Sequence, residues 1–116
     1  MRHLEDELQI SCVRAFEFQH RKIARLLHHS PNGGKRNAIE AARFKAMGVR
    51  AGFPDLILLY PNKCCHFLAM ELKTKKGKQS PYQKEYQALI ESVGGKYVVI
   101  RSLDQFLQEV NDYLHS

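Results

Sequence analysis

Two apolar runs lie close together in the chain and decide its fold, DLILLY at residues 55–60 and CHFLAMELK at residues 65–73. Both have the length of a strand. The first run shows no alternation of apolar and polar residues, which is typical of a strand buried on both faces. Because residues 61–63 turn the chain between them, the two runs are expected to form a short antiparallel hairpin at the centre of a sheet.

Helical spacing and turn residues place the elements before this hairpin. Residues 4–19 have an apolar stripe that predicts an amphipathic helix, and residues 23–28 are a candidate strand. Residues 30–34 are dense in turn formers and predict a loop. Asn37 is then placed to cap a helix through Met47, which Gly48 can end in the left-handed conformation.

A helix, a strand and a second helix are expected after the hairpin. Ser80 and Gln83 have the spacing of a capping box, so a helix is predicted from Pro81, ended by Gly94 and Gly95. Residues 97–100 form a further strand, and a second capping box precedes the last helix. The predicted buried stripe of the first of these helices consists of Tyr82, Tyr86, Leu89, Ile90 and Val93. The sequence therefore predicts one α/β domain over residues 1–116, a small mixed sheet flanked by helices.

Length and composition exclude several classes of protein. The chain has 116 residues, 44% of them hydrophobic, which suits one globular domain and excludes two. No apolar stretch is long enough to span a bilayer, and the acidic first residues do not form a secretory signal. Three cysteines cannot pair completely, so reduced thiols and an intracellular, cytoplasmic location in a bacterial or virus-infected cell are expected.

The basic charge is concentrated in two segments of the chain. Eighteen Lys and Arg against twelve Asp and Glu leave a net charge of +6. Residues 11–50 carry nine basic and two acidic side chains, and residues 71–87 carry five and two. Such clustering is typical of a protein that binds a polyanion, because each neutralised phosphate releases counterions. A soluble basic surface without a partner is the alternative.

The hairpin brings three charged residues onto one face of the sheet. With Lys63 at the middle of the connection, Asp55 lies opposite Glu71, and Lys73 projects from the same face as Glu71. Two opposed carboxylates repel each other unless a proton or cation lies between them, and their oxygens suit Mg²⁺ or Mn²⁺. The alternative is structural, with Glu71 and Lys73 as an ion pair and Asp55 as a cap of the bend.

Several motifs together resemble a known family, the virus-type replication-repair nuclease (VRR-NUC) domain of the PD-(D/E)XK superfamily. They are GVRAGFPDL at residues 48–56, MELKT at 70–74 and GKQSPYQK at 77–84, with PNGGKR at 31–36 similar to the family's loop. Each motif alone is weak, whereas their joint occurrence over nearly the whole chain is specific. The resemblance implies a core like that of restriction endonucleases.

The resemblance also implies roles for individual residues. Asp55 and Glu71 would be metal ligands with the Leu72 carbonyl as a third, and Lys73 would be the catalytic lysine. Gln83 matches a polar position near the site, although its role in the capping box is an equally good explanation. Glu5, with Glu7 as its rival, matches an acid of the first helix. The basic residues expected to contact phosphates are Lys35, Arg36, Arg50, Lys75, Lys76 and Lys78.

The function implied is that of an Mg²⁺- or Mn²⁺-dependent DNA endonuclease that hydrolyses phosphodiester bonds. Branched double-stranded DNA, such as a four-way (Holliday) junction, is the expected substrate. A homodimer would give so small a chain a second active site and more contact area. Two alternatives stay open. The first is a nucleic-acid binding module without catalysis, and the second is a structural subunit of a DNA repair complex.

Overall fold

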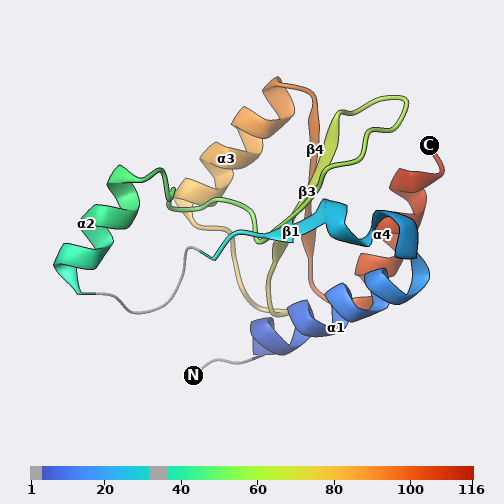
Figure 1. Ribbon diagram of the computed structural model, residues 1–116, viewed down its shortest axis with the longest axis horizontal. Coiled ribbons are helices and arrows are strands. Elements are labelled where there is room, and N and C mark those ends of the chain that lie inside the picture. Colours follow the sequence, from blue (N-terminus) through green and yellow to red (C-terminus); the bar gives the residue numbers. More distant parts are fainter. Residues whose placement is uncertain (1–3, 32–36) are drawn as a thin grey trace.

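The computed structural model describes residues 4–31 and 37–116, and a four-stranded mixed sheet lies at its centre (Figure 1). The sheet has the order β1-β2-β3-β4, with β1 antiparallel to β2, β2 antiparallel to β3, and β3 parallel to β4. The predicted α/β fold with a small mixed sheet is therefore confirmed. The strands are β1 (Leu27–His29), β2 (Leu56–Leu58), β3 (Phe67–Leu72) and β4 (Gly95–Ile100).

The register of the central hairpin is the predicted one. Leu56 is paired with Met70, and Leu58 is paired with Leu68. One further step in the same register sets Asp55 opposite Glu71, because Asp55 precedes β2 directly and Glu71 follows Met70. A one-residue slip would have turned the whole apolar set of β3 to the other face.

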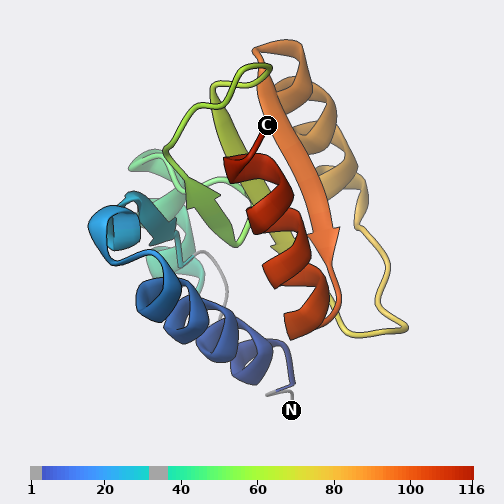
Figure 2. The same cartoon turned by 90° about the vertical axis from the view of Figure 1, so that its right-hand side faces the viewer.

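Helices cover both faces of the sheet. α1 and α4 pack against each other on one face, and α3 covers the other (Figure 2). α2 stands to the side of the sheet (Figure 1). Within the described ranges, none of the helices has the length and apolar character needed to cross a membrane. The helices are α1 (Leu4–Gln19), the 3₁₀ helix η1 (Arg21–Leu26), α2 (Ala38–Ala46), α3 (Pro81–Ser92) and α4 (Leu103–Leu114).

Alternate residues of β3 supply two cores of unequal size. Leu68, Met70 and Leu72 face α1 and α4, where they join a large cluster that includes Phe16 and Phe106. On the face under α3, a smaller cluster contains Ala69, Ile90 and Tyr97. Glu71 shares the side of β3 with Ala69, since side chains two residues apart project from the same face. A carboxylate thus takes the place of an apolar residue on the α3 side.

The candidate strand at residues 23–28 is wrong in most of its length. The chain forms η1 over Arg21–Leu26, and only Leu27–His29 pairs with β2 as an edge strand. Ile23 and Leu26 are three residues apart and both contact the main core. A 3₁₀ turn places residues at this spacing on one side, whereas a strand would point them to opposite faces.

The predicted apolar stripe of α3 is also wrong in three of its five positions. Tyr82, Leu89 and Val93 are 61%, 59% and 64% exposed. Ile90 is buried and Tyr86 is half-buried, as predicted. The side of α3 that faces the sheet includes the polar Gln83 and Gln87, whose side chains bond to groups of the sheet and the preceding loop. Hydrogen bonding, rather than apolar burial alone, sets the rotation of the helix.

The predicted helix caps are confirmed in position, and one differs in detail. At α3 the Ser80 hydroxyl accepts a bond from the Gln83 N–H, and the Gln83 side chain accepts one from the Ser80 N–H. At α4 the Ser102 hydroxyl caps the Gln105 N–H. The Gln105 side chain, however, accepts from the N–H of Arg101 at 2.7 Å, one residue before the cap.

The three cysteines should differ sharply in reactivity, because burial raises the pKa of the Cys12 thiol to about 12 while Cys64 is exposed. Since the thiolate is the reactive form, a disulfide reagent such as DTNB at pH 8 should modify Cys64 quickly in the native protein and leave Cys12 untouched. Unfolding in guanidinium should make all three react. Fast modification of Cys12 in the native Cys64→Ser variant would contradict this packing.

Candidate active site

Two hydrogen bonds hold Asp55 at the edge of the site, one to its side chain and one to its backbone carbonyl. Its Oδ2 atom accepts a bond of 2.7 Å from the N–H of Leu72. Its carbonyl oxygen lies 2.8 Å from Nδ1 of His29, at the end of β1. The half-buried side chain is thereby fixed next to the end of β3, which is where the predicted register requires it to be.

Among the described residues, Glu71 is the only charged side chain that is buried, with 3% of its surface exposed. Its Oε2 atom accepts a bond of 2.6 Å from the Gln83 side-chain amide. Its Oε1 atom accepts a weaker bond of 3.3 Å from the Tyr97 hydroxyl. Both carboxylate oxygens therefore have a donor, as a buried polar group requires.

The pKa of Glu71 is raised to about 8, chiefly by burial and further by the negative charge of Asp55 and a hydrogen bond between the two carboxyl groups. The positive charge of Lys73 and the Tyr97 hydroxyl act in the opposite direction. Two carboxyl groups this close share a proton more readily than they both ionise. A cation between them would remove the same repulsion.

The donor set at this point fits a hard divalent cation. Asp55 and Glu71 provide carboxylate oxygens, and Leu72, between Glu71 and Lys73, provides a backbone carbonyl. Mg²⁺ and Mn²⁺ prefer oxygen ligands of these kinds. Across residues 4–31 and 37–116, no three His, Cys, Asp or Glu side chains gather around one point. Neither Glu5 nor Glu7 thus joins the pair here, and their role as ligands stays a prediction.

Gln83 contributes to the site and to its own helix at the same time. Its Oε1 atom accepts from the Ser80 N–H at 2.8 Å, while its Nε2 atom donates to Glu71. Gln83 therefore forms the capping box and contacts the buried carboxylate at the same time, two roles that the sequence allowed together. The cap fixes the side chain that donates to the buried carboxylate.

The basic residues predicted to contact phosphates are divided among several places. Arg50, Lys75, Lys76 and Lys78 are exposed, and the last three lie in the loop that follows β3. Lys73 is partly buried, and its aliphatic stem lies beside Gly77 of that loop. Lys35 and Arg36, and most of the loop predicted at residues 30–34, lie outside the described residues.

Arg101 orders the lysine-rich loop, residues 73–80 between β3 and α3. This role was not predicted from the sequence. Its Nη1 atom donates to the carbonyl oxygens of Thr74 and Gly77, both at 2.7 Å, and to that of Lys75 at 3.3 Å. A guanidinium that bridges several carbonyls fixes the backbone of the loop without using the lysine side chains. The lysines thus keep their charges available on a defined surface.

Tyr97 and Gln79 are the other members of the site that sequence reasoning missed. Gln79 donates to the Tyr97 hydroxyl at 3.3 Å, and burial raises the pKa of that hydroxyl, so it stays a donor at neutral pH. The parallel pairing of Tyr97 with Ala69 brings it next to Glu71. Only the polar hydroxyl within an apolar strand could have signalled this role, because the pairing partner is distant in sequence.

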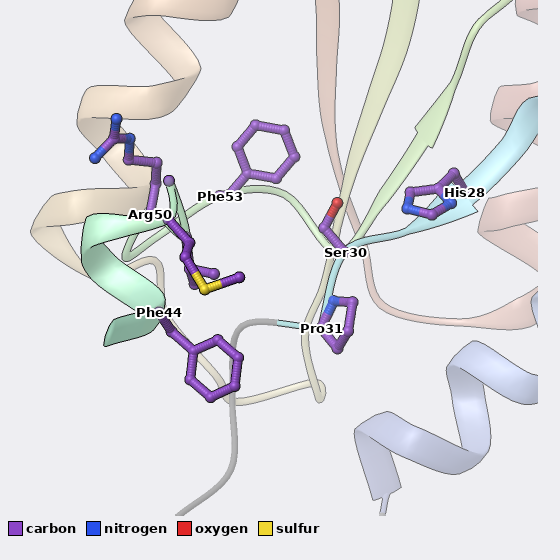
Figure 3. Close-up of a pocket in the computed structure, with 9 residues that line it drawn as sticks. His28, Ser30, Pro31, Phe44, Arg50 and Phe53 are labelled. Carbon is purple, nitrogen blue, oxygen red and sulfur yellow. The ribbon is translucent and has the colours of Figure 1, made fainter. Parts of the chain in front are cut away.

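A hollow of about 640 Å³ lies next to α2, between that helix and the end of β1. Figure 3 shows Phe44 and Arg50 on the α2 side of it, and His28, Ser30 and Pro31 on the other. Its walls are largely apolar. This hollow is separate from the Asp55 and Glu71 pair, since neither residue lines it.

Two comparisons with known proteins agree with each other. A family model described as "VRR-NUC domain" matches residues 2–104. A solved structure described as "VRR_NUC domain protein" is 32% identical, with a TM-score of 0.84, and the match covers 96% of this chain and 88% of that one. No curated protein matches the chain.

Replacing Gln83 by alanine should destabilise the protein, because it removes a cap bond and leaves a buried carboxylate oxygen without its donor. The free energy of unfolding should fall by about 1–3 kcal/mol, the usual range for an unsatisfied buried group. Urea unfolding followed by circular dichroism measures this. Gln108→Ala, which removes an exposed glutamine of α4, is the matched control and should change stability by less than about 0.5 kcal/mol. Equal effects of the two substitutions would contradict the role of Gln83.

Proposed function

Because the chain belongs to the VRR-NUC domain family, whose members are of nuclease type, we propose that it is a divalent-metal-dependent DNA endonuclease that cleaves branched DNA. One observation carries the catalytic part of this proposal. Asp55 and the buried Glu71 come together at one end of the central hairpin, with Lys73 next in line on the side of Glu71. Acidic pairs with an adjacent lysine are suited to phosphodiester hydrolysis.

The oxygens of Asp55, Glu71 and the Leu72 carbonyl would hold Mg²⁺ or Mn²⁺, which would polarise the phosphodiester and lower the pKa of a bound water. Lys73 would then neutralise negative charge that develops on the phosphate. Gln83 and Tyr97 orient Glu71 through their hydrogen bonds. Attack of water on phosphorus with loss of the 3′ oxygen would leave a 5′-phosphate and a 3′-hydroxyl.

The charge distribution supports DNA as the substrate. The lysines at positions 75, 76 and 78 are exposed on a loop that starts directly after Lys73, and Arg101 holds that loop in place. Lysines so placed would contact phosphates on one side of the bond that is cut. Selectivity for four-way junctions and a two-fold homodimer belong to the same proposal, since two strands need two sites.

Divalent cations should stabilise the folded protein if Asp55 and Glu71 are ligands. Mg²⁺ or Mn²⁺ at about 100 times its dissociation constant should add about 2.7 kcal/mol and raise the melting temperature of the wild type. Glu71→Gln should abolish this increase, because the neutral amide is a poor ligand. Glu85→Gln, which neutralises an exposed carboxylate on α3, should keep it. An equal increase in all three proteins would mean that the cation binds elsewhere.

Cleavage itself is tested on matched linear and four-way-junction DNA with Mg²⁺, Mn²⁺ or EDTA. We expect the wild type to cut the junction in either metal and not in EDTA. Glu71→Ala should reduce the rate by at least about 100-fold while junction binding persists. Glu85→Ala should cut as the wild type does. Binding without cutting in every metal would refute the catalytic proposal and favour a nucleic-acid binding module.

A further inference from the structure

We propose that a second hollow, between α2 and α3, binds one nucleotide that is unpaired or displaced from the stack at a branch point of the DNA, with the Tyr82 ring stacked on its base. The inference deepens the proposed function, on which it rests, because it assigns the recognition of branched DNA to a particular side chain. It uses residues that have no part in holding a metal. Its test is chosen so that it can fail while the nuclease proposal stands.

The hollow has the size and the lining of a site for a small aromatic ligand. Its volume is about 400 Å³, within the range of about 300–1,000 Å³ that is usual for small-molecule sites. Phe44 and Lys45 of α2 form one wall, and Tyr82 and Tyr86 of α3 form the other. Arg50 lines it as well, in the chain that joins α2 to β2.

Tyr82 is a large aromatic residue that the fold leaves exposed. It lies in the first turn of α3, and 61% of its surface is accessible, although its place in the apolar stripe predicted burial. Its backbone is nevertheless fixed. A Cβ atom on Gly52 would lie 2.6 Å from Cβ of Tyr82 and 2.9 Å from the Gln83 nitrogen, so the turn at Gly52 packs directly against this part of the helix.

The position of Tyr82 next to the active site decides which part of the DNA it would meet. Gln83, the next residue, donates to Glu71, and Asp55 is three residues beyond Gly52. The segment after Ala51 thus leads to Asp55, the start of α3 carries the donor to Glu71, and both segments border the hollow. A nucleotide in the hollow would be a close neighbour of the phosphate that is cut.

The charges of the hollow match a nucleotide rather than an apolar peptide. Lys45 and Arg50 are cationic and exposed, while no Asp or Glu is among the described residues that line the hollow. Aromatic faces together with basic side chains are the usual combination in sites for single-stranded nucleic acid. A base in a continuous duplex has both faces covered by its neighbours, so only an unpaired or displaced base can stack on Tyr82.

Two DNA probes that differ in one nucleotide test the proposal. The first is a duplex with a single unpaired 2-aminopurine, and the second is the same duplex with that base paired to thymine. Binding is measured by fluorescence anisotropy in EDTA, so that no strand is cut, and stacking is measured by quenching of the 2-aminopurine. The proteins are the wild type, Tyr82→Ala, Tyr82→Phe and, as the matched control, Leu89→Ala, whose side chain is 59% exposed on the same helix.

Tyr82→Ala should weaken binding of the bulged probe by roughly 5- to 150-fold, the range seen when one stacking aromatic is removed, and should abolish the quenching. The affinity of Tyr82→Ala for the paired probe should fall much less. Tyr82→Phe should keep both affinity and quenching, because its ring still stacks, and Leu89→Ala should behave as the wild type. Circular dichroism confirms that each variant is folded.

Several results would overturn the site. These are an equal loss of affinity for both probes in Tyr82→Ala, no loss for either, or a wild type that does not prefer the bulged probe. If Tyr82→Ala changed the oligomeric state of the protein in solution, the hollow would instead be a contact between two copies of the chain. Metal-dependent cutting that persists with any of these results would leave the nuclease proposal intact, whereas stacking without cutting would leave the nucleotide site intact.

Discussion

The burial of one carboxylate constrains most of this structure. Glu71 projects from the central strand into the face under α3, where 3% of its surface is exposed. A buried carboxyl group needs hydrogen-bond partners, and Glu71 receives them from α3 through Gln83 and from β4 through Tyr97. The hairpin register then places Asp55 opposite Glu71, and an oxygen of Asp55 accepts a hydrogen bond from the Leu72 N–H. The hydrogen bonds of a single side chain therefore align β3, α3 and β4.

Local sequence patterns predicted much of this arrangement, but they could not predict contacts between residues that are distant in the sequence. The hairpin register followed from the length of its connection, and the caps at Ser80 and Ser102 followed from their spacing. Tyr97 and Arg101 could not be found in this way, because their partners lie in β3 and in the loop after it, 24 to 27 residues away. The edge strand was misplaced because Ile23 and Leu26 suit a strand and a 3₁₀ turn equally well by composition.

The lysine-rich loop is held in place through its backbone, so that its lysine side chains are not used in ordering it. An isolated run of lysines is normally a mobile, solvated segment, and its side chains lose entropy when they bind. Here the Arg101 guanidinium bonds to backbone carbonyls of the loop, so its path is set before any ligand arrives. The lysine side chains at positions 75, 76 and 78 stay exposed around that fixed path. A preformed loop lowers the entropic cost of binding a polyanion.

The rotation of α3 links the carboxylate pair to the nucleotide site that we propose. Gln83, Tyr86, Gln87 and Ile90 have the spacing i, i+3, i+4 and i+7, and this is the face that lies on the sheet. An apolar stripe through Tyr82, Leu89 and Val93 would have required a different rotation, which would have carried Gln83 away from Glu71. Since successive residues differ by about 100° around a helix, the rotation that aims Gln83 at the buried carboxylate turns Tyr82 outward. The exposure of Tyr82 beside the site is therefore a consequence of how the site is built.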